Sequence, residues 1–548
     1  MKNTLLIVLL LSMGVSCVQR SGHHASDTPA SLTRLGSHSF KITTEHPEAQ
    51  RAFDRGLTWA YGFGHYAAEQ EFRRAAQVDP DCAMAYWGIA LVNGPHINLP
   101  LVPPERSAKA WEALTRARDL APRSRPQEQA LIRALAERYA NPQPEDRSPL
   151  DLAYAEAMRG LWRQYPADPD IGALCAEALM DLHPWDLWTT NGPQPWTPEI
   201  VSTLERVLKL DPRHPGANHL YIHAIEASPN PGKALAAANR LLNLVPDSSH
   251  LVHMPSHIYA RVGDWRRAAE SNRKAMQADA RYREAYPRPG FYGLYMIHNT
   301  HFLAFTSMMQ GRREEALTLA RQMIEQIPDT FLKEYGPVAD GFMVFVPEVM
   351  MRFGLWEQIL AEPAPRGGLP FSTAYWHFTR AVAFTALDRL SEAREEKSAF
   401  ERACTKVPND SFFGNNSAAD LLVIAERVLA GEMLAQEGRL DAAVTVLQAA
   451  VDLEDRLRYD EPPDWIQPVR HTLGAVMVRA GRFAEAEQVY RDDLSKWPHN
   501  GWSLLGLRES LRGLGKTAEA ETVAGHLRRS WAGADVTPSA SCYCQAAR

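Results

Sequence analysis

The sequence predicts an all-α fold: a right-handed superhelical solenoid built from antiparallel helix pairs. Residue types recur at a spacing of 34, as for His219 and His253 and again for His223 and His257. That spacing is the length of one two-helix unit that stacks on its neighbours. The chain of 548 residues is also longer than one compact core normally serves, which favours an extended array of units.

Composition excludes several other classes of protein. Apolar residues make up 45% and charged residues 23% of the chain, as expected for a folded protein rather than a disordered one. The net charge is -6 and no long basic run is present, so we expect no nucleic-acid partner. Beyond residue 20, no apolar run is long enough to span a membrane.

The N-terminus has the pattern of a targeting segment. Lys2 is followed by an apolar run and then by small residues leading to Cys17. This pattern predicts a secretory signal. It also resembles a bacterial lipoprotein signal covering residues 1–17, and that resemblance implies a lipid on Cys17 as the only membrane contact. By the same resemblance, Val18 implies the outer membrane, facing the periplasm or the cell exterior. Simple secretion, with Cys17 incidental, is the alternative.

Residues 18–45 lack periodicity and predict a flexible tether. We expect N-terminal repeats with loop insertions over 46–212. The Pro- and Gly-rich loop within them carries His183, Trp185 and Trp188. Such a loop either packs on the edge of the array or covers a binding groove as a lid.

The second half of the chain continues the array. We predict His-rich central repeats over 213–330, degenerate helical repeats over 331–410, regular repeats over 411–531 and a disordered tail over 532–548. Small residues are needed where paired helices cross closely. The glycines expected at such crossings are Gly56, Gly431, Gly474 and Gly506.

The order of small, aromatic and proline residues resembles that of the tetratricopeptide repeat. Ala68, Phe72 and Pro80 show it in the first unit. The stretches Ala83-Met84-Ala85-Tyr86-Trp87-Gly88 and His253-Met254-Pro255-Ser256-His257 are similar to stretches found in a group of exported bacterial proteins with these repeats. The resemblance implies that a protein, peptide or small ligand binds in a concave groove, with Trp87 among the candidate groove residues.

Histidines recur at equivalent positions of three consecutive units. His219, His223 and Glu226 fall at i, i+4 and i+7, which places them on one face of a helix. The remaining candidate ligands are His250, His253, His257, His298 and His301. We predict that imidazoles from adjacent units lie close enough on one concave surface to share an ion, with Glu226 as carboxylate ligand or base.

Imidazole and carboxylate together suit Zn, Cu, Fe or Mn. An open position in such a site would suit a catalytic metal. Three interpretations therefore stay open: a groove with a metal site, a scaffold at the bacterial envelope without metal, and a metal-dependent enzyme of unknown substrate. Histidines with a purely structural role are a further possibility. Outlying candidates for the site or groove are His65, His183, Glu348 and His377.

The six cysteines predict neither a disulfide framework nor a cysteine zinc site, because no CxxC pair is present. Cys82, Cys175 and Cys404 stand alone in helical patterns and are expected to behave as small apolar residues. Cys542 and Cys544 fall in the predicted tail.

Overall fold

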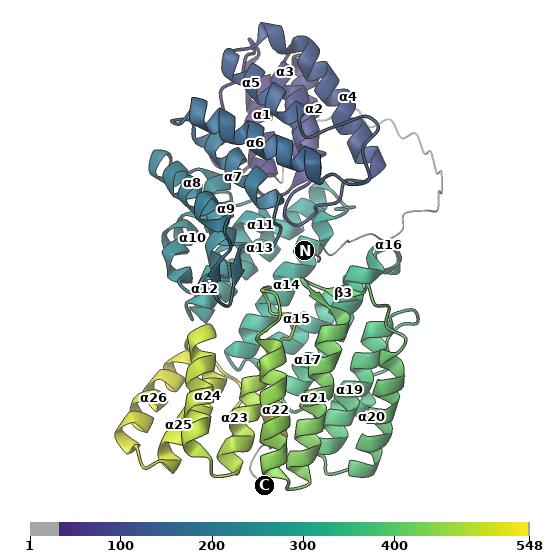
Figure 1. Ribbon diagram of the computed structural model, residues 1–548, viewed down its shortest axis with the longest axis vertical. Helices are drawn as coiled ribbons and strands as arrows, with labels where there is room; N and C mark the ends of the chain where they lie inside the picture. Colours follow the sequence, from purple (N-terminus) through teal and green to yellow (C-terminus); the bar gives the residue numbers. More distant parts are fainter. Residues whose placement is uncertain (1–31, 546–548) are drawn as a thin grey trace. The chain divides into compact units, whose positions relative to one another are not determined.

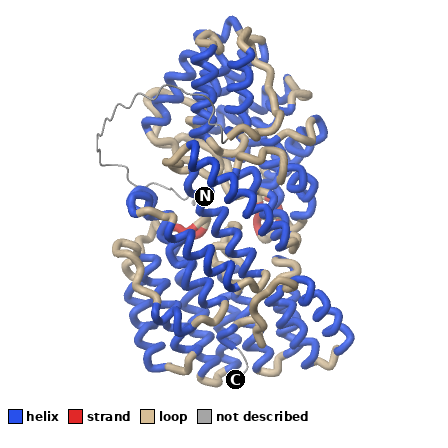
Figure 2. Tube along the Cα trace, turned by 180° about the vertical axis from the view of Figure 1, so that it is seen from behind, coloured by secondary structure: helices blue, strands red, loops and turns tan. Residues whose placement is uncertain are grey.

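The computed structural model describes residues 32–545. The predicted signal peptide with Cys17, the first part of the predicted tether and the last three residues lie outside this range. Helices make up nearly all of the regular structure that is described, with two short strand pairs (Figure 2), which confirms the all-α prediction. None of the described helices has the length and apolarity to cross a bilayer.

The chain divides into two compact units. Unit 1 contains the chain up to Pro255 together with Lys274–Tyr295, and unit 2 contains Ser256–Arg273 together with the chain from Met296 onward. Three helices contain the points where the chain passes from one unit to the other: α12 (Pro255–Arg261), α13 (Trp265–Ala285) and α14 (Tyr292–Met309).

Unit 1 begins with helices α1 and α2 and ends, before the first crossing, with α11 (Figure 1). Proline stands at the start of many of its helices, where a missing backbone N–H costs nothing. The elements are α1 (Pro47–Ala60), α2 (His65–Val78), α3 (Ala83–Val92), α4 (Pro104–Leu120), η1 (Ala121–Arg123), α5 (Pro126–Ala136), α6 (Ser148–Gln164), α7 (Pro169–Asp181), β1 (Trp188–Thr189), β2 (Gly192–Pro193), α8 (Thr197–Leu210), α9 (Pro215–Glu226), η2 (Pro231–Ala234), α10 (Leu235–Leu241) and α11 (Ser249–His253).

In unit 2, consecutive helices again pack as neighbours, and α19 to α22 stand side by side (Figure 1). The elements are α15 (Arg313–Glu325), α16 (Asp329–Ala339), η3 (Asp340–Val344), α17 (Phe345–Arg352), α18 (Trp356–Ala361), α19 (Pro370–Ala386), α20 (Leu390–Cys404), β3 (Phe412–Phe413), β4 (Asn416–Ser417), α21 (Ala418–Gln436), α22 (Leu440–Glu454), α23 (Val469–Arg479), α24 (Phe483–Lys496), α25 (Gly501–Gly513), α26 (Thr517–Ser530) and η4 (Tyr543–Gln545).

The glycines predicted at helix crossings are confirmed. A Cβ atom on Gly56 would lie 2.7 Å from the ring of Phe72, and one on Gly506 would lie 2.0 Å from the ring of Tyr490. Gly474 faces the same tyrosine from the other neighbouring helix, at 2.4 Å. Gly431 meets the side chain of Leu447 at 2.5 Å. At each site an aromatic or branched side chain fills the space that the glycine leaves open.

The turn inside many helix pairs uses one recurring hydrogen bond. In unit 2, Asp264 N–H donates to Tyr259 O at 2.8 Å, and Gly263, just before Asp264, adopts a φ of 79°. The same bond closes the turn between α1 and α2, where Gly64 N–H donates to Trp59 O at 2.9 Å. In that turn, however, the left-handed position is held by Phe63, with φ 54°.

Two segments predicted as flexible or disordered are packed in the structure. Within the predicted tether 18–45, Leu35 and Phe40 are buried and Arg34 pairs with Asp247 at 2.9 Å. Within the predicted tail 532–548, Cys542 is buried and bonded to Cys544. Both predictions were wrong for the described residues because the segments bury apolar side chains against helices distant in sequence.

Candidate metal centre

Helix α9 positions the first two histidines of the candidate site. Pro215 opens the helix, and the ring of His214 caps it by accepting a hydrogen bond from Ala217 N–H at 3.1 Å. His219 and His223 follow four residues apart, so they lie on one face. Every residue of α9 is buried, which places both imidazoles in the interior of unit 1 rather than on an exposed groove surface.

The main chain fixes the orientation of His219. Its Nδ1 atom lies 2.7 Å from the carbonyl oxygen of Tyr61. Because a carbonyl oxygen only accepts, Nδ1 must carry the proton, and the lone pair of the neutral ring is on Nε2. This Nε2 atom lies 3.1 Å from Nε2 of His250, which comes from α11.

The orientation of His223 is fixed in the same way by a carboxylate. Its Nδ1 atom lies 2.8 Å from an Oε1 atom of Glu226, and both side chains are buried. Nδ1 therefore donates and Nε2 carries the lone pair. A carboxylate behind a histidine is the usual arrangement at metal sites, since it holds the ring in place and makes it a stronger ligand. In this cluster Glu226 orients His223.

One ligand atom from each of His219, His223 and His250 lies within 4.8 Å of the other two. Two nitrogens bound to one tetrahedral zinc ion would be about 3.3 Å apart, given bonds of roughly 2.0–2.1 Å. The 3.1 Å separation of the His219 and His250 Nε2 atoms is close to that value. Without an ion, the same distance fits a hydrogen bond that His250 donates to His219.

Phe63 supplies the apolar wall of the cluster. Its ring lies 4.6 Å from the ring of His219 and 5.5 Å from that of His250, measured between centroids, and it stacks on His96 at 4.5 Å. A bulky residue at positive φ is a strained exception. The equivalent turn positions in unit 2 include Gly263, which has no such strain.

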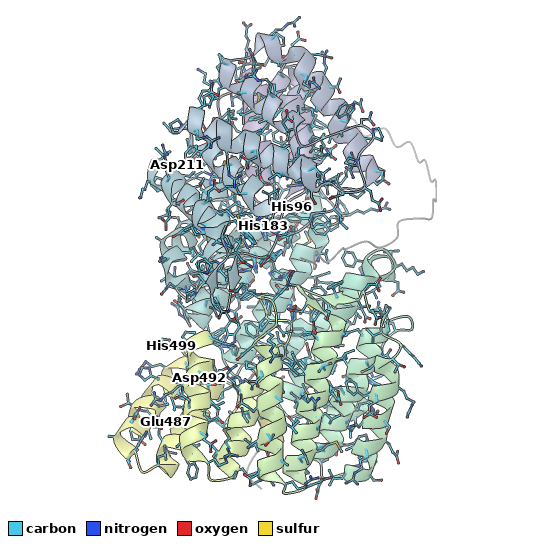
Figure 3. The ribbon with its side chains drawn as sticks, viewed as in Figure 1. His96, His183, Asp211, Glu487, Asp492 and His499 are labelled. Atoms are coloured by element: carbon cyan, nitrogen blue, oxygen red, sulfur yellow. A yellow bond between two sulfur atoms is a disulfide. The ribbon has the colours of Figure 1, made fainter. Side chains whose placement is uncertain are left out.

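The tryptophan loop covers another side of the cluster. Trp185, itself at φ 57°, sets its ring edge-on to His223 with the centroids 5.3 Å apart. Trp188 donates its indole N–H to Ala224 O on α9 at 2.8 Å. His183 stacks on Trp196 at 3.6 Å and belongs to the packing of the loop itself. His96 and His183 (Figure 3) thus come from the loops that follow α3 and α7.

The other predicted ligands are divided between the two units. His253 is buried in unit 1, with its ring 6.0 Å from that of His250. His257 and His298 lie in unit 2, with ring centroids 5.8 Å apart, and Nδ1 of His257 is 3.7 Å from a carboxylate oxygen of Glu461. The ring of His301 packs edge-on against Phe345, and burial lowers its pKa to about 3. None of these four histidines belongs to the cluster of His219, His223 and His250.

The remaining residues that the sequence suggested for the site or groove lie outside the cluster of three histidines. Trp87 is a core residue near Phe53. His377 contacts Glu396 at 2.7 Å in unit 2. Glu348 is buried there, and burial raises its pKa to about 8. Burial and nearby arginines lower the pKa of His65 to about 3, and its ring lies 4.5 Å from that of His96.

A second cluster in unit 1 was not predicted. His38 and Tyr61 contact Oδ1 of Asp170 at 2.9 and 2.7 Å, and His214 lies 3.3 Å from the same oxygen. One carboxylate oxygen thus faces three protein donors. These contacts join the N-terminal segment to α7 and to the residue before α9, so we interpret this cluster as structural.

Sequence reasoning also missed Tyr61, Phe63 and His96. The signal for His96 is its position after Gly94-Pro95 in a lengthened inter-helix turn. No comparable sequence signal indicates Tyr61 or Phe63, whose contacts with α9 connect residues more than 150 positions apart.

Comparison with known proteins identifies no family. No family model matches the chain, and no curated protein matches it. Among solved structures, a human IFIT1 dimer with m7Gppp-AAAA is similar at 12% identity, covering 89% of this chain and 91% of that one, with a TM-score of 0.35. The APC/C hetero-tetramer Cut9-Hcn1 is similar at 12% identity, covering 88% and 76%, with a TM-score of 0.31. Likeness at this level identifies no ligand for this chain.

Proposed function

We propose that this helical-repeat protein binds one transition-metal ion, with zinc as the best fit, through Nε2 of His219, His223 and His250. The observation that carries the proposal is the protonation pattern. Two of the three rings have Nδ1 committed to a protein acceptor, and Nε2 of His219 meets Nε2 of His250 at 3.1 Å. Three neutral imidazoles form a ligand set that zinc accepts while retaining an open position.

When bound, such an ion acts as a Lewis acid and lowers the pKa of a coordinated water. The protein's own residues do the remaining work. The Tyr61 carbonyl and the Glu226 carboxylate hold two rings in the ligating tautomer. Phe63 and Trp185 line the cluster with aromatic surface. The open position would bind the donor atom of a small ligand or peptide group, which makes ligand binding the function that this site supports best.

Calorimetric titration of the full-length, metal-depleted chain with zinc tests the proposal. We expect one tight equivalent in the wild type and its loss in the variant His219→Ala/His223→Ala/His250→Ala. His46→Ala is the matched control, because His46 is exposed and makes no side-chain cap to its helix. Unchanged zinc binding in the triple variant would refute the site. Absence of tight binding in the wild type would leave a scaffold without metal as the function.

We also propose that the protein is exported and held at the outer membrane by a lipid on Cys17. The support is the sequence pattern before Cys17, which lies outside the described residues. The variant Cys17→Ala should move the protein from the membrane fraction to the soluble envelope fraction. Continued membrane association of that variant would overturn the lipid anchor.

A further inference from the structure

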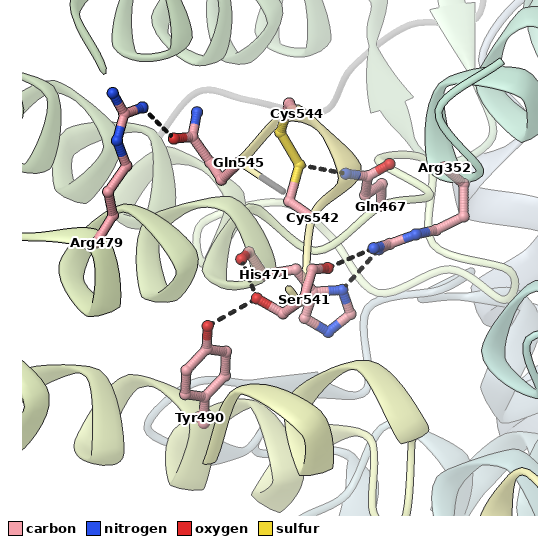
Figure 4. The surroundings of a disulfide bond; sticks show 9 residues. All are labelled: Arg352, Gln467, His471, Arg479, Tyr490, Ser541, Cys542, Cys544 and Gln545. Carbon is pink, nitrogen blue, oxygen red and sulfur yellow. Dashed lines mark hydrogen bonds between the residues drawn. A yellow bond between two sulfur atoms is a disulfide. The ribbon is translucent and has the colours of Figure 1, made fainter. Parts of the chain in front are cut away.

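The C-terminal segment of unit 2 is fastened to the helices by a set of polar contacts (Figure 4). Arg352 on α17 donates to the Ser541 carbonyl, and the Ser541 hydroxyl donates to the His471 carbonyl at 2.7 Å. The hydroxyls of Tyr490 and Ser541 also lie 2.7 Å apart. These contacts hold Cys542 in the interior, where it is 2% exposed.

A disulfide joins Cys542 and Cys544, which are two residues apart. Glu432 on α21 faces this pair: one of its carboxylate oxygens and the two sulfur atoms all lie within 4.8 Å of one another. Glu432 is 4% exposed, and its Oε2 atom has no hydrogen-bond partner among the described residues. A buried carboxyl oxygen without a partner is costly, and it requires an explanation.

A second polar group at this place is also incompletely satisfied. Gln467, in the loop before α23, is 9% exposed and directs its side-chain N–H toward Sγ of Cys542 at 4.0 Å. Its Oε1 atom has no partner among the described residues. The pair of cysteines thus lies beside one buried carboxyl oxygen without a partner, that of Glu432, and beside the amide of Gln467.

We propose that Cys542, Cys544 and Glu432 form a redox-controlled site for a thiolate-preferring divalent cation such as zinc. A thiol reductant breaks the Cys542–Cys544 bond: the reductant forms its own disulfide, and its two hydrogens appear on the two cysteine sulfurs. The cation then displaces these two protons and the carboxyl proton of Glu432. The oxidised pair offers no thiolate, so the site is closed in that state.

Charge and burial fit this two-state description. Burial raises the pKa of Glu432 to about 8, so the carboxyl group is mostly protonated at neutral pH beside the uncharged disulfide. A divalent cation with two thiolates and one carboxylate has a net charge of -1. The Arg352 guanidinium, which binds the carbonyl just before Cys542, supplies the compensating positive charge. A cation at this site would tie the C-terminal segment to α21 through Glu432, which the disulfide, joining two residues within that segment, does not do.

Cadmium titration of the full-length chain tests the site, because thiolate-to-cadmium charge transfer absorbs in the ultraviolet and imidazole sites give no such band. The chain is reduced with a phosphine and desalted without air before Cd²⁺ is added. We expect one equivalent to produce the band in the reduced chain and no band in the oxidised chain. Cys542→Ser should remove it, and Glu432→Gln should weaken cadmium binding at least about tenfold.

Cys404→Ser is the matched control, since Cys404 is a free, half-buried cysteine of the same unit, and the band should persist in that variant. Alkylation of the reduced wild type, mapped by mass spectrometry, needs no variant: cadmium should protect Cys542 and Cys544 but leave Cys404 as it was. A band that survives in Cys542→Ser, affinity unchanged in Glu432→Gln, or equal alkylation with and without cadmium would each overturn the proposal.

Discussion

At the scale of single residues, the contact made by Nδ1 decides which nitrogen of a histidine can bind a metal. Nδ1 of His219 donates to a main-chain carbonyl, which no side-chain substitution removes. Nδ1 of His223 donates to the Glu226 carboxylate, which can be altered. The role of Glu226 can therefore be tested without changing any proposed ligand.

Glu226→Gln should lower zinc affinity by about 10- to 100-fold while leaving one equivalent bound. The amide oxygen can still accept from Nδ1 of His223, but it lacks the charge that makes the ring a stronger ligand. Competition with a chromophoric chelator measures the affinity. Glu45→Gln, at an exposed position, should leave it unchanged. Equal affinities for wild type and Glu226→Gln would show that Glu226 does not support the site.

The sequence could indicate part of this centre. The spacing of four placed His219 and His223 on one face of a helix, and the repeat phase drew attention to His250. The spacing did not reveal the direction of each ring, because that depends on Tyr61 and Phe63 in a turn about 160 residues earlier. The spacing also could not show that His250 belongs to the cluster whereas His301 does not, since the ring of His301 packs among phenylalanines.

At the scale of helices, stability depends on close crossings. Gly506→Ala should lower the free energy of unfolding by about 1–3 kcal/mol, because its Cβ would lie 2.0 Å from the ring of Tyr490 and the tyrosine must move. Gly525→Ala on α26 is the control. Its Cβ would meet only flexible arginine ends at 3.7 Å or more, so helix propensity should make it neutral or slightly stabilising. Urea unfolding curves compare the two variants, and equal stability of Gly506→Ala and wild type would contradict this packing.

The N-terminal segment 32–45 should hold more weakly to unit 1 as the pH rises. Burial opposes the charged form of His38, but the hydrogen bond and charge of Asp170 outweigh it and raise the pKa of His38. The pKa of Asp170 is lowered despite its burial, through His214 and His38. The stability that the charged His38 adds to this attachment is therefore fully present below the unfolded pKa of His38, about 6.5. It is lost as the pH rises through the higher pKa of His38 in the folded protein.

Amide exchange of residues 34–42 measures this attachment. In the variant His38→Gln, the opening free energy measured by exchange of these amides should be lower than in wild type by about 1–2 kcal/mol near pH 5.5. This difference from wild type should shrink at higher pH. The exposed variant His46→Gln should behave as wild type at each pH. A difference that grows with pH would contradict the assignment to His38.

The packing of residues 32–45 also shows what periodicity cannot predict. The segment has no helical pattern, so the sequence favoured a tether, yet Leu35 and Phe40 are buried against helices of unit 1. Arg34 and His38 find their acid partners 213 and 132 positions away. Local pattern predicts local structure, whereas these attachments depend on which distant surfaces the fold brings near.

At the scale of the whole chain, the prediction of an all-α array of helix pairs is confirmed. Helix pairs continue through both units, with small residues at their crossings. The predicted central block 213–330 is shared between the two units, because the chain passes from one unit to the other after Pro255, after Arg273 and after Tyr295. His253 and His257 occupy the same positions in their repeat as His219 and His223 in theirs. His253, however, belongs to unit 1, whereas His257 belongs to unit 2.

X-ray absorption of the zinc-loaded, oxidised full-length chain shows whether three imidazoles of unit 1 hold one ion. We expect three nitrogen neighbours with imidazole scattering at about 2.0–2.1 Å, and no sulfur at about 2.3 Å, because the disulfide closes the cysteine site. A first shell with sulfur, or with fewer than three imidazoles, would contradict this proposal.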